Sequence, residues 1–81
     1  MARYFFDTDD GEERVIDEIG IEFPTLDAAR SQAVAALPGI AGDSPRLEDG
    51  REIVTVVRDE TGRAIFRARL AVSGEWIGSE D

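Results

Sequence analysis

The stretch from Phe23 to Gly39 decides the fold, and it reads FPTLDAARSQAVAALPG. Apolar side chains recur in it at helical spacing, so we expect one helix with a narrow, alanine-rich stripe. A lone amphipathic helix must bury its stripe on another layer, and the rest of the chain is typical of strands and turns. The stretch therefore predicts a helix packed on a sheet. Its stripe consists of Leu26, Ala29, Ala33, Ala36 and Leu37.

Both ends of this helix carry sequence signals. Thr25 is a good N-cap, and the proline before it excludes an earlier start. Pro38-Gly39 is typical of helix termination, so we expect the helix to end at Leu37. Residues 38–50 are rich in Gly, Pro, Asp and Ser. They predict an irregular connection that is mobile in its middle.

Strand-prone runs precede the helix. Residues 2–7 form an aromatic run with apolar side chains on both faces, so we expect this strand to be covered on both sides or to lie centrally. A hairpin turn at Asp10-Gly11 leads into a second strand over residues 14–18, and residues 21–23 resume an extended path.

The clearest strand signal is a hairpin over residues 51–72. Gly62 suits the positive-φ position of a type I turn with a G1 bulge, which pairs Asp59 with Arg63. The face that this register assigns to the helix consists of Val54, Val56, Phe66, Ala68 and Leu70. The opposite face is half apolar and half arginine, and it consists of Ile53, Thr55, Val57, Ile65, Arg67 and Arg69.

These elements predict a single small α+β domain over residues 1–81, in ββαββ order, with the helix on one face of a mostly antiparallel sheet. Residues 73–81 form a C-terminal tail. We expect Trp76 and Ile77 to fold back onto the sheet and the last acidic residues to fray.

Composition excludes many functions. The 81 residues include no Cys and no His, and all nine basic residues are Arg, so thiol, imidazole and Lys chemistry are absent. We therefore expect a protein that is not an enzyme and needs no cofactor. The net charge of −9 argues against binding to nucleic acid or an anionic membrane surface. The N-terminal residues show no signal-peptide pattern, so we expect a cytoplasmic protein.

Three features combine along the chain: the opening strand Arg3–Phe6, the segment Asp17–Pro24 that leads into Leu26–Arg30, and the hairpin Arg58–Arg63. Across residues 3–70 they resemble a family of short bacterial proteins known only as a domain of unknown function. The resemblance implies a compact α+β fold and no particular activity. Family members often carry a His in or after the first strand, and many continue the helix where this chain has Pro38-Gly39.

The first half of the chain is also similar, more loosely, to the small antitoxins of the HicB type, in which an extended segment precedes a helix lying on a sheet. This resemblance makes an antitoxin-like or other regulatory role an alternative.

Two sets of side chains are candidates for binding. Asp7, Asp9 and Asp10 offer oxygen ligands suited to Ca²⁺ or Mg²⁺, but Gly11 falls one position early for an EF-hand loop. A solvated turn is therefore the favoured interpretation, and a divalent-cation-binding domain is the second alternative.

Arg67 and Arg69 suit phosphates or bases, although cross-strand pairing with acidic neighbours is the simpler role. Apolar side chains on both faces of the second hairpin favour a protein partner or a homo-oligomer, because one helix covers only one face. We therefore predict a small non-enzymatic protein-interaction module that acts through a sheet face or edge.

Overall fold

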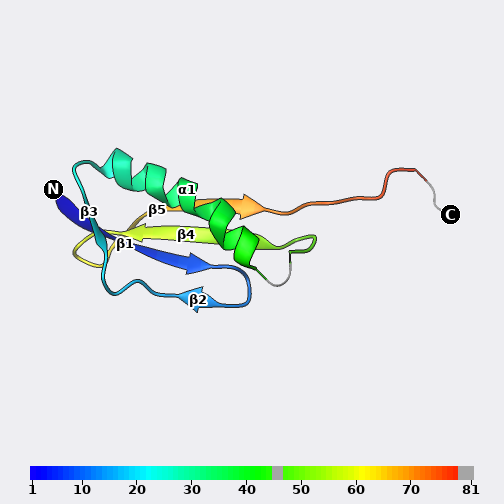
Figure 1. Cartoon of the computed structure of the whole chain (residues 1–81), viewed down its shortest axis with the longest axis horizontal. Helices are drawn as coiled ribbons and strands as arrows, with labels where there is room; N and C mark the ends of the chain where they lie inside the picture. Colours follow the sequence, from blue (N-terminus) through cyan, green and yellow to red (C-terminus); the bar gives the residue numbers. More distant parts are fainter. Residues whose placement is uncertain (45–46, 79–81) are drawn as a thin grey trace.

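The computed structural model of the chain describes residues 1–44 and 47–78, in which one helix lies across one face of a sheet (Figure 1). The predicted α+β class is confirmed, with the helix on a mostly antiparallel sheet. The chain has one strand more than the predicted ββαββ order. The predicted second strand and the extended path after it form two separate short strands before the helix. The elements are β1 (Ala2–Asp9), β2 (Arg14–Val15), β3 (Ile21–Phe23), α1 (Leu26–Asp43), β4 (Glu52–Arg58) and β5 (Ala64–Ala71).

The start of α1 is as predicted. The Thr25 hydroxyl accepts a hydrogen bond from the Ala28 N–H at 3.1 Å, which satisfies one of the free N–H groups of the first turn. Within the described residues, no helix has both the length and the apolar character that crossing a membrane requires.

The predicted end of α1 at Leu37 is wrong, because the helix continues through Pro38 to Asp43. A proline inside a helix removes one hydrogen bond and strains the preceding turn. Here Ile40 and Ala41 pack on a buried cluster that includes Leu37, and this burial offsets the loss. The predicted connection over 38–50 is shorter for the same reason, and its centre, residues 45–46, lies outside the described residues.

The strands follow the order β2-β1-β4-β5, and β3 also pairs with β1. The central position predicted for β1 is therefore confirmed. Between β2 and β3, the Asp17 carboxylate accepts the Phe6 N–H of β1 at 3.0 Å. Since this N–H belongs to the edge of β1 that faces away from β4, β2 and β3 share that edge, one at each end of β1.

The predicted turn of the second hairpin is confirmed. The Asp59 N–H donates to the Arg63 carbonyl at 2.9 Å, and Gly62 has a φ of 89°. The predicted register is nevertheless wrong by one residue. Arg58 pairs with Ala64 but Val57 pairs with Phe66, so a bulge at Ile65 shifts every later pair. A slip of one residue exchanges the two faces of a strand.

Because of this shift, the predicted faces of β4 are wrong. Ile53, Thr55 and Val57 are completely buried under α1, whereas Val54 and Val56 point to the opposite side of the sheet. Phe66 and Ala68 keep their predicted contact with the core. Ile65 is half-buried against the core instead of lying on the outer face, and only Arg67 and Arg69 of the predicted interaction face remain there.

The core consists of two small clusters beneath α1. Ala29 and Ala33 lie on Val57, so the alanine stripe brings the helix close to the sheet as predicted. Leu37 forms the second cluster, with Ile53 and Ala68. The leucine expected at the other end, Leu26, is half exposed instead. Aromatic side chains close the first cluster: Tyr4, Phe6, Phe23 and Phe66.

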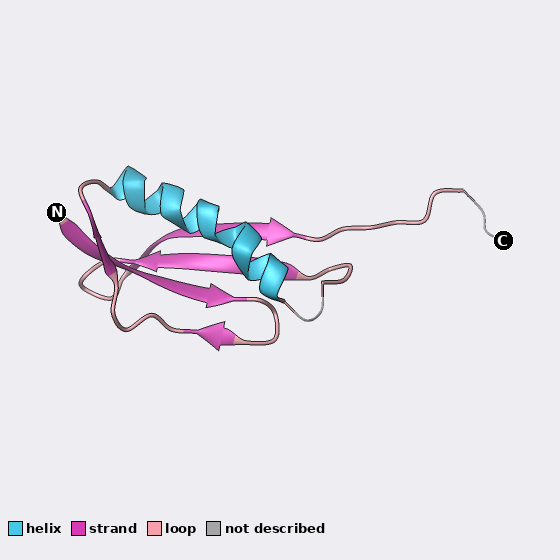
Figure 2. Ribbon diagram, in the orientation of Figure 1, coloured by secondary structure: helices cyan, strands magenta, loops and turns pink. Residues whose placement is uncertain are grey.

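The predicted folding back of Trp76 and Ile77 is wrong. Their side chains are 98% and 92% exposed, and the chain after β5 extends away from the body (Figure 2). The fraying predicted for the last acidic residues concerns residues 79–81, which lie outside the described residues.

One buried polar atom gives a first testable prediction. The Thr55 hydroxyl is buried with no hydrogen-bond partner among the described residues. Because an unsatisfied buried hydroxyl costs free energy, Thr55→Val should raise the free energy of unfolding by about 1 kcal/mol. Urea denaturation at neutral pH measures the change.

The matched control is Thr61→Val, because the Thr61 hydroxyl donates to Asp59 at 2.6 Å. This second variant should lower the stability. If Thr55→Val also lowers it, the hydroxyl has a partner and the prediction is wrong.

Candidate functional site

The sheet surface that α1 leaves uncovered, which we call the open face, carries three stripes of side chains. The stripe on β5 is basic, the stripe on β4 is apolar and the stripe on β1 is acidic. Since antiparallel neighbours point to the same side, each row across the face contains one side chain of each kind. The two rows are Asp7–Val56–Arg67 and Asp9–Val54–Arg69.

These stripes line a shallow groove of about 440 Å³, which also includes Arg14, Ile16 and Arg58. The two valines at its centre are half-buried, and Arg67 and Arg69 are exposed. Because the groove lies on an open sheet surface, it suits a segment of polypeptide lying across the strands better than an enclosed small molecule.

Arg67 and Arg69 form no ion pair with any residue that the structure describes. The predicted pairing with acidic cross-strand neighbours is wrong, because those neighbours are Val56 and Val54. In a chain with a net charge of −9, two unpaired guanidinium groups create a locally basic strip.

Arg58, in contrast, is engaged by its own chain. Its guanidinium donates to both carboxylate oxygens of Asp7, at 2.7 and 3.0 Å, and to the Asp17 carbonyl at 2.8 Å. It also lies 5.2 Å from the centre of the Phe5 ring. The hydrogen bond from Arg58 is the main reason that the pKa of Asp7 lies below its usual value. This cluster joins β4, β1 and the segment after β2.

Asp17 completes the cluster from the segment between β2 and β3. Burial alone raises the pKa of its carboxyl, but hydrogen bonds from the N–H groups of Ile19, Phe6 and Gly20 outweigh burial, and the pKa is lowered. The Asp17 N–H in turn donates to Asp7 at 3.0 Å. Asp17 therefore acts as a folding residue and leaves no oxygen free for a ligand.

The carboxylates of the acidic first turn are engaged by the chain itself. Asp9 and Asp10 both accept N–H groups of their own turn, at 2.7–2.9 Å. The bonds from Glu13 and Glu12 lower the pKa of Asp10. Asp7 is held by the cluster described above. Among the described residues, no three acidic side chains come together in an arrangement that could hold a metal ion.

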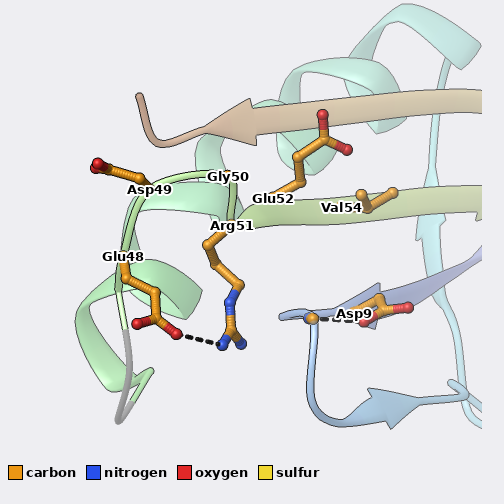
Figure 3. Close-up of a pocket in the computed structure, with 8 residues that line it drawn as sticks. Asp9, Glu48, Asp49, Gly50, Arg51, Glu52 and Val54 are labelled. Atoms are coloured by element: carbon orange, nitrogen blue, oxygen red, sulfur yellow. Dashed lines mark hydrogen bonds and ion pairs between the residues drawn. The ribbon is translucent and has the colours of Figure 1, made fainter. Parts of the chain in front are cut away.

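A second hollow, of about 450 Å³, adjoins one end of the open face (Figure 3). It is rich in carboxylates, but Arg51 lies among them. Arg51 donates to the Asp10 carbonyl at 3.0 Å and pairs at 3.6 Å with both Glu12 and Glu48. Its side chain is only 13% exposed. These bonds join the first turn to the loop before β4, so we place the candidate site on the open face instead.

Sequence reasoning therefore found half of the open face. It placed Arg67 and Arg69 on the outer side, where they are, but it assigned Val54 and Val56 to the helix. The strict alternation of β4 showed which of its side chains share a face. It did not show which of the two faces the helix covers.

Comparisons with known proteins identify a family but name no activity. A search of curated proteins and a search of solved structures find no match to the chain. The family model of DUF6894, a domain of unknown function, matches residues 3–71, which include the whole of α1 and all the strand residues except Ala2 at the start of β1. The chain therefore belongs to the family of this domain of unknown function, DUF6894.

Proposed function

We propose that this protein is a small, non-enzymatic protein-interaction module that binds a partner across the open face. The proposal depends on Arg67 and Arg69, which are exposed and form no ion pair within the described residues. They flank the two valines of β4. Arginine is enriched at protein interfaces, because its flat guanidinium stacks on aromatic rings and pairs with carboxylates.

The partner that fits is a polypeptide segment with both acidic and apolar side chains. Carboxylates complement Arg67 and Arg69, and an apolar side chain complements Val54 and Val56. Nucleic acid fits less well. Its binding rewards many cationic contacts, and the net charge of −9 repels a polyanion.

The chemistry of the described residues supports a binding role over catalysis. The carboxylates of Asp7 and Asp17 have lowered pKa values because they are held as anions by hydrogen bonds within the fold. A general acid or base working near neutral pH needs the opposite shift. The chain also has no His, Cys or Lys to take that role.

Selection of a random peptide library on the immobilised protein tests this proposal. We expect the selected peptides to combine acidic with aromatic or aliphatic residues. Their affinity, measured by calorimetry, should fall about ten-fold or more for the variant Arg67→Ser/Arg69→Ser, because charge-assisted hydrogen bonds are lost.

The matched control is Arg30→Ser/Arg63→Ser, which removes the same charge from the helix surface and the hairpin turn. It should leave the affinity within about two-fold. The proposal fails if no peptide is selected, or if both double variants weaken binding equally.

A further inference from the structure

The most unusual surface feature lies outside the open face. Residues 73–78, which we call the C-terminal arm, follow β5 and extend from the body (Figure 1). Trp76 is 98% exposed and Ile77 is 92% exposed. Large apolar side chains with so little cover mark a contact surface when they lie next to each other.

The overall dimensions show how far the arm departs from a compact shape. The radius of gyration is 15.3 Å, and the longest dimension is 58 Å against 22 and 19 Å for the other two. A compact chain of this length has a radius of gyration of about 12 Å. The apolar side chains of the arm therefore lie beyond the reach of their own core.

The base of the arm is fixed in this direction. The Val72 N–H donates to the Arg51 carbonyl at 2.9 Å, and the Gly50 N–H donates to the Val72 carbonyl at 3.0 Å. Two residues later, Gly74 packs so closely on Asp49 that a Cβ there would lie 2.7 Å from a carboxylate oxygen. To reach the open face of its own sheet, the arm would have to reverse within a few residues of these contacts.

The arm carries the chemistry that the open face accepts. Glu75 supplies a carboxylate, and Trp76 supplies the largest apolar surface among the side chains. Arg67 and Arg69 are the unpaired cations of the open face, and an arginine also stacks favourably on an indole ring. Charge and apolar character therefore match between the arm of one molecule and the open face of another.

We propose that the C-terminal arm of one copy of this chain docks on the open face of a second copy, and that the exchange is reciprocal. In this dimer, Trp76 covers Val54 and Val56, and Glu75 pairs with Arg67 or Arg69 of the other copy. This assignment rests on the proposed function of the open face. A reciprocal exchange closes under two-fold symmetry, because each copy provides one arm and one face.

We expect a weak dimer, because its interface is small. One indole ring buries about 150–250 Å², and two short arms bury less than the roughly 1,200 Å² of a standard interface. We expect a dissociation constant in about the micromolar to millimolar range. The measurement must therefore extend to high protein concentration.

Sedimentation equilibrium and tryptophan fluorescence over a dilution series test the proposal on the full chain. Trp76 is the only tryptophan, so its emission reports on the arm alone. We expect the mass to rise from monomer to dimer with concentration, and the emission to shift to the blue in parallel. A monomer at every concentration overturns the proposal. So does a blue-shifted emission that persists on dilution, because the arm then folds onto its own chain.

Charge exchange identifies the contact. Glu75→Arg and Arg67→Glu/Arg69→Glu should each weaken the dimer about ten-fold, and the triple variant that combines them should regain most of the loss. Glu60→Arg is the matched control, because it makes the same charge change as Glu75→Arg in an exposed turn. A dimer that survives Trp76→Ser, or a triple variant that regains nothing, overturns the arm contact.

The outcomes separate this inference from the proposed function. If the wild-type chain stays monomeric but binds selected peptides through Arg67 and Arg69, the arm exchange is wrong and the interaction module stands. If it neither dimerises nor binds peptides, both proposals are wrong.

Discussion

Asp7→Asn should lower the free energy of unfolding by about 2–3 kcal/mol. The side chain of Asp7 is 14% exposed and that of Arg58 is 23% exposed. The carboxylate accepts two hydrogen bonds from Arg58 and one from the Asp17 N–H. An amide keeps the shape but turns one acceptor into a donor, which must then face another donor. The variant therefore leaves a half-buried guanidinium without its counter-charge.

The stability that Asp7→Asn loses should depend on pH in a defined direction. The pKa values of Asp7 and Asp17 are lowered in the folded protein, while an unfolded aspartate titrates near about 3.9. Their contribution is complete above the unfolded pKa and is lost as the pH falls through the lower folded values. The difference in stability between wild type and Asp7→Asn should therefore be largest near about pH 7 and smaller near about pH 3.

Urea unfolding at both pH values measures this difference. Glu60→Gln is the control, because it removes one carboxylate from an exposed turn. The Glu60 side chain forms no ion pair with any described residue. It should leave the stability unchanged at both pH values. An equal effect of the two variants would show that net charge, not the Arg58 contact, stabilises the fold.

Gly20→Ala should lower the free energy of unfolding by about 3 kcal/mol. Gly20 is buried with a φ of 76°, a backbone conformation that costs other residues about 1–2 kcal/mol. A Cβ there would also lie 2.9 Å from the Tyr4 carbonyl oxygen and 2.9 Å from the Phe5 ring. The Tyr4 carbonyl cannot move without disturbing the pairing of β1 with β3, in which Tyr4 pairs with Ile21.

Gly62→Ala separates the two parts of this cost. Gly62 has a φ of 89°, but no atom lies within 4 Å of a Cβ at that position. Only the backbone cost applies there, about 1–2 kcal/mol. Thermal or urea unfolding of both variants therefore gives the steric cost at Gly20 as a difference. Equal losses would mean that β3 moves aside to admit the methyl group.

The difference between local and long-range interactions also explains which features could be predicted from the sequence. The turn at Gly62 and the cap at Thr25 depend on neighbouring residues only, and both are as predicted. The bulge at Ile65 depends on how β5 fits against β4 and α1 as a whole, and no local signal marks it. This one inserted residue moved Val54 and Val56 from the predicted helix side to the open face.

The end of α1 follows the same rule. Pro38-Gly39 is a strong local stop signal, yet the burial of Ile40 and Ala41 extends the helix beyond it. The contact between Arg58 and Asp7 could not be predicted from local patterns either, because the two residues are 51 positions apart in the chain. A pattern read along the sequence showed the residue types of the candidate site but could not bring these partners together.

The division of one flank of β1 between β2 and β3 limits how the sheet can grow. The two short strands and the Asp17 carboxylate occupy the backbone groups along that flank, so it offers no continuous template for a strand from another molecule. On the other side, β5 is the outermost strand of the described sheet. The outer edges of β2 and β3 are only two and three residues long, so β5, with eight residues, is the longest border of the described sheet for a strand of another molecule. Two molecules that join through β5 leave only these short edges outside, which disfavours growth into a fibril.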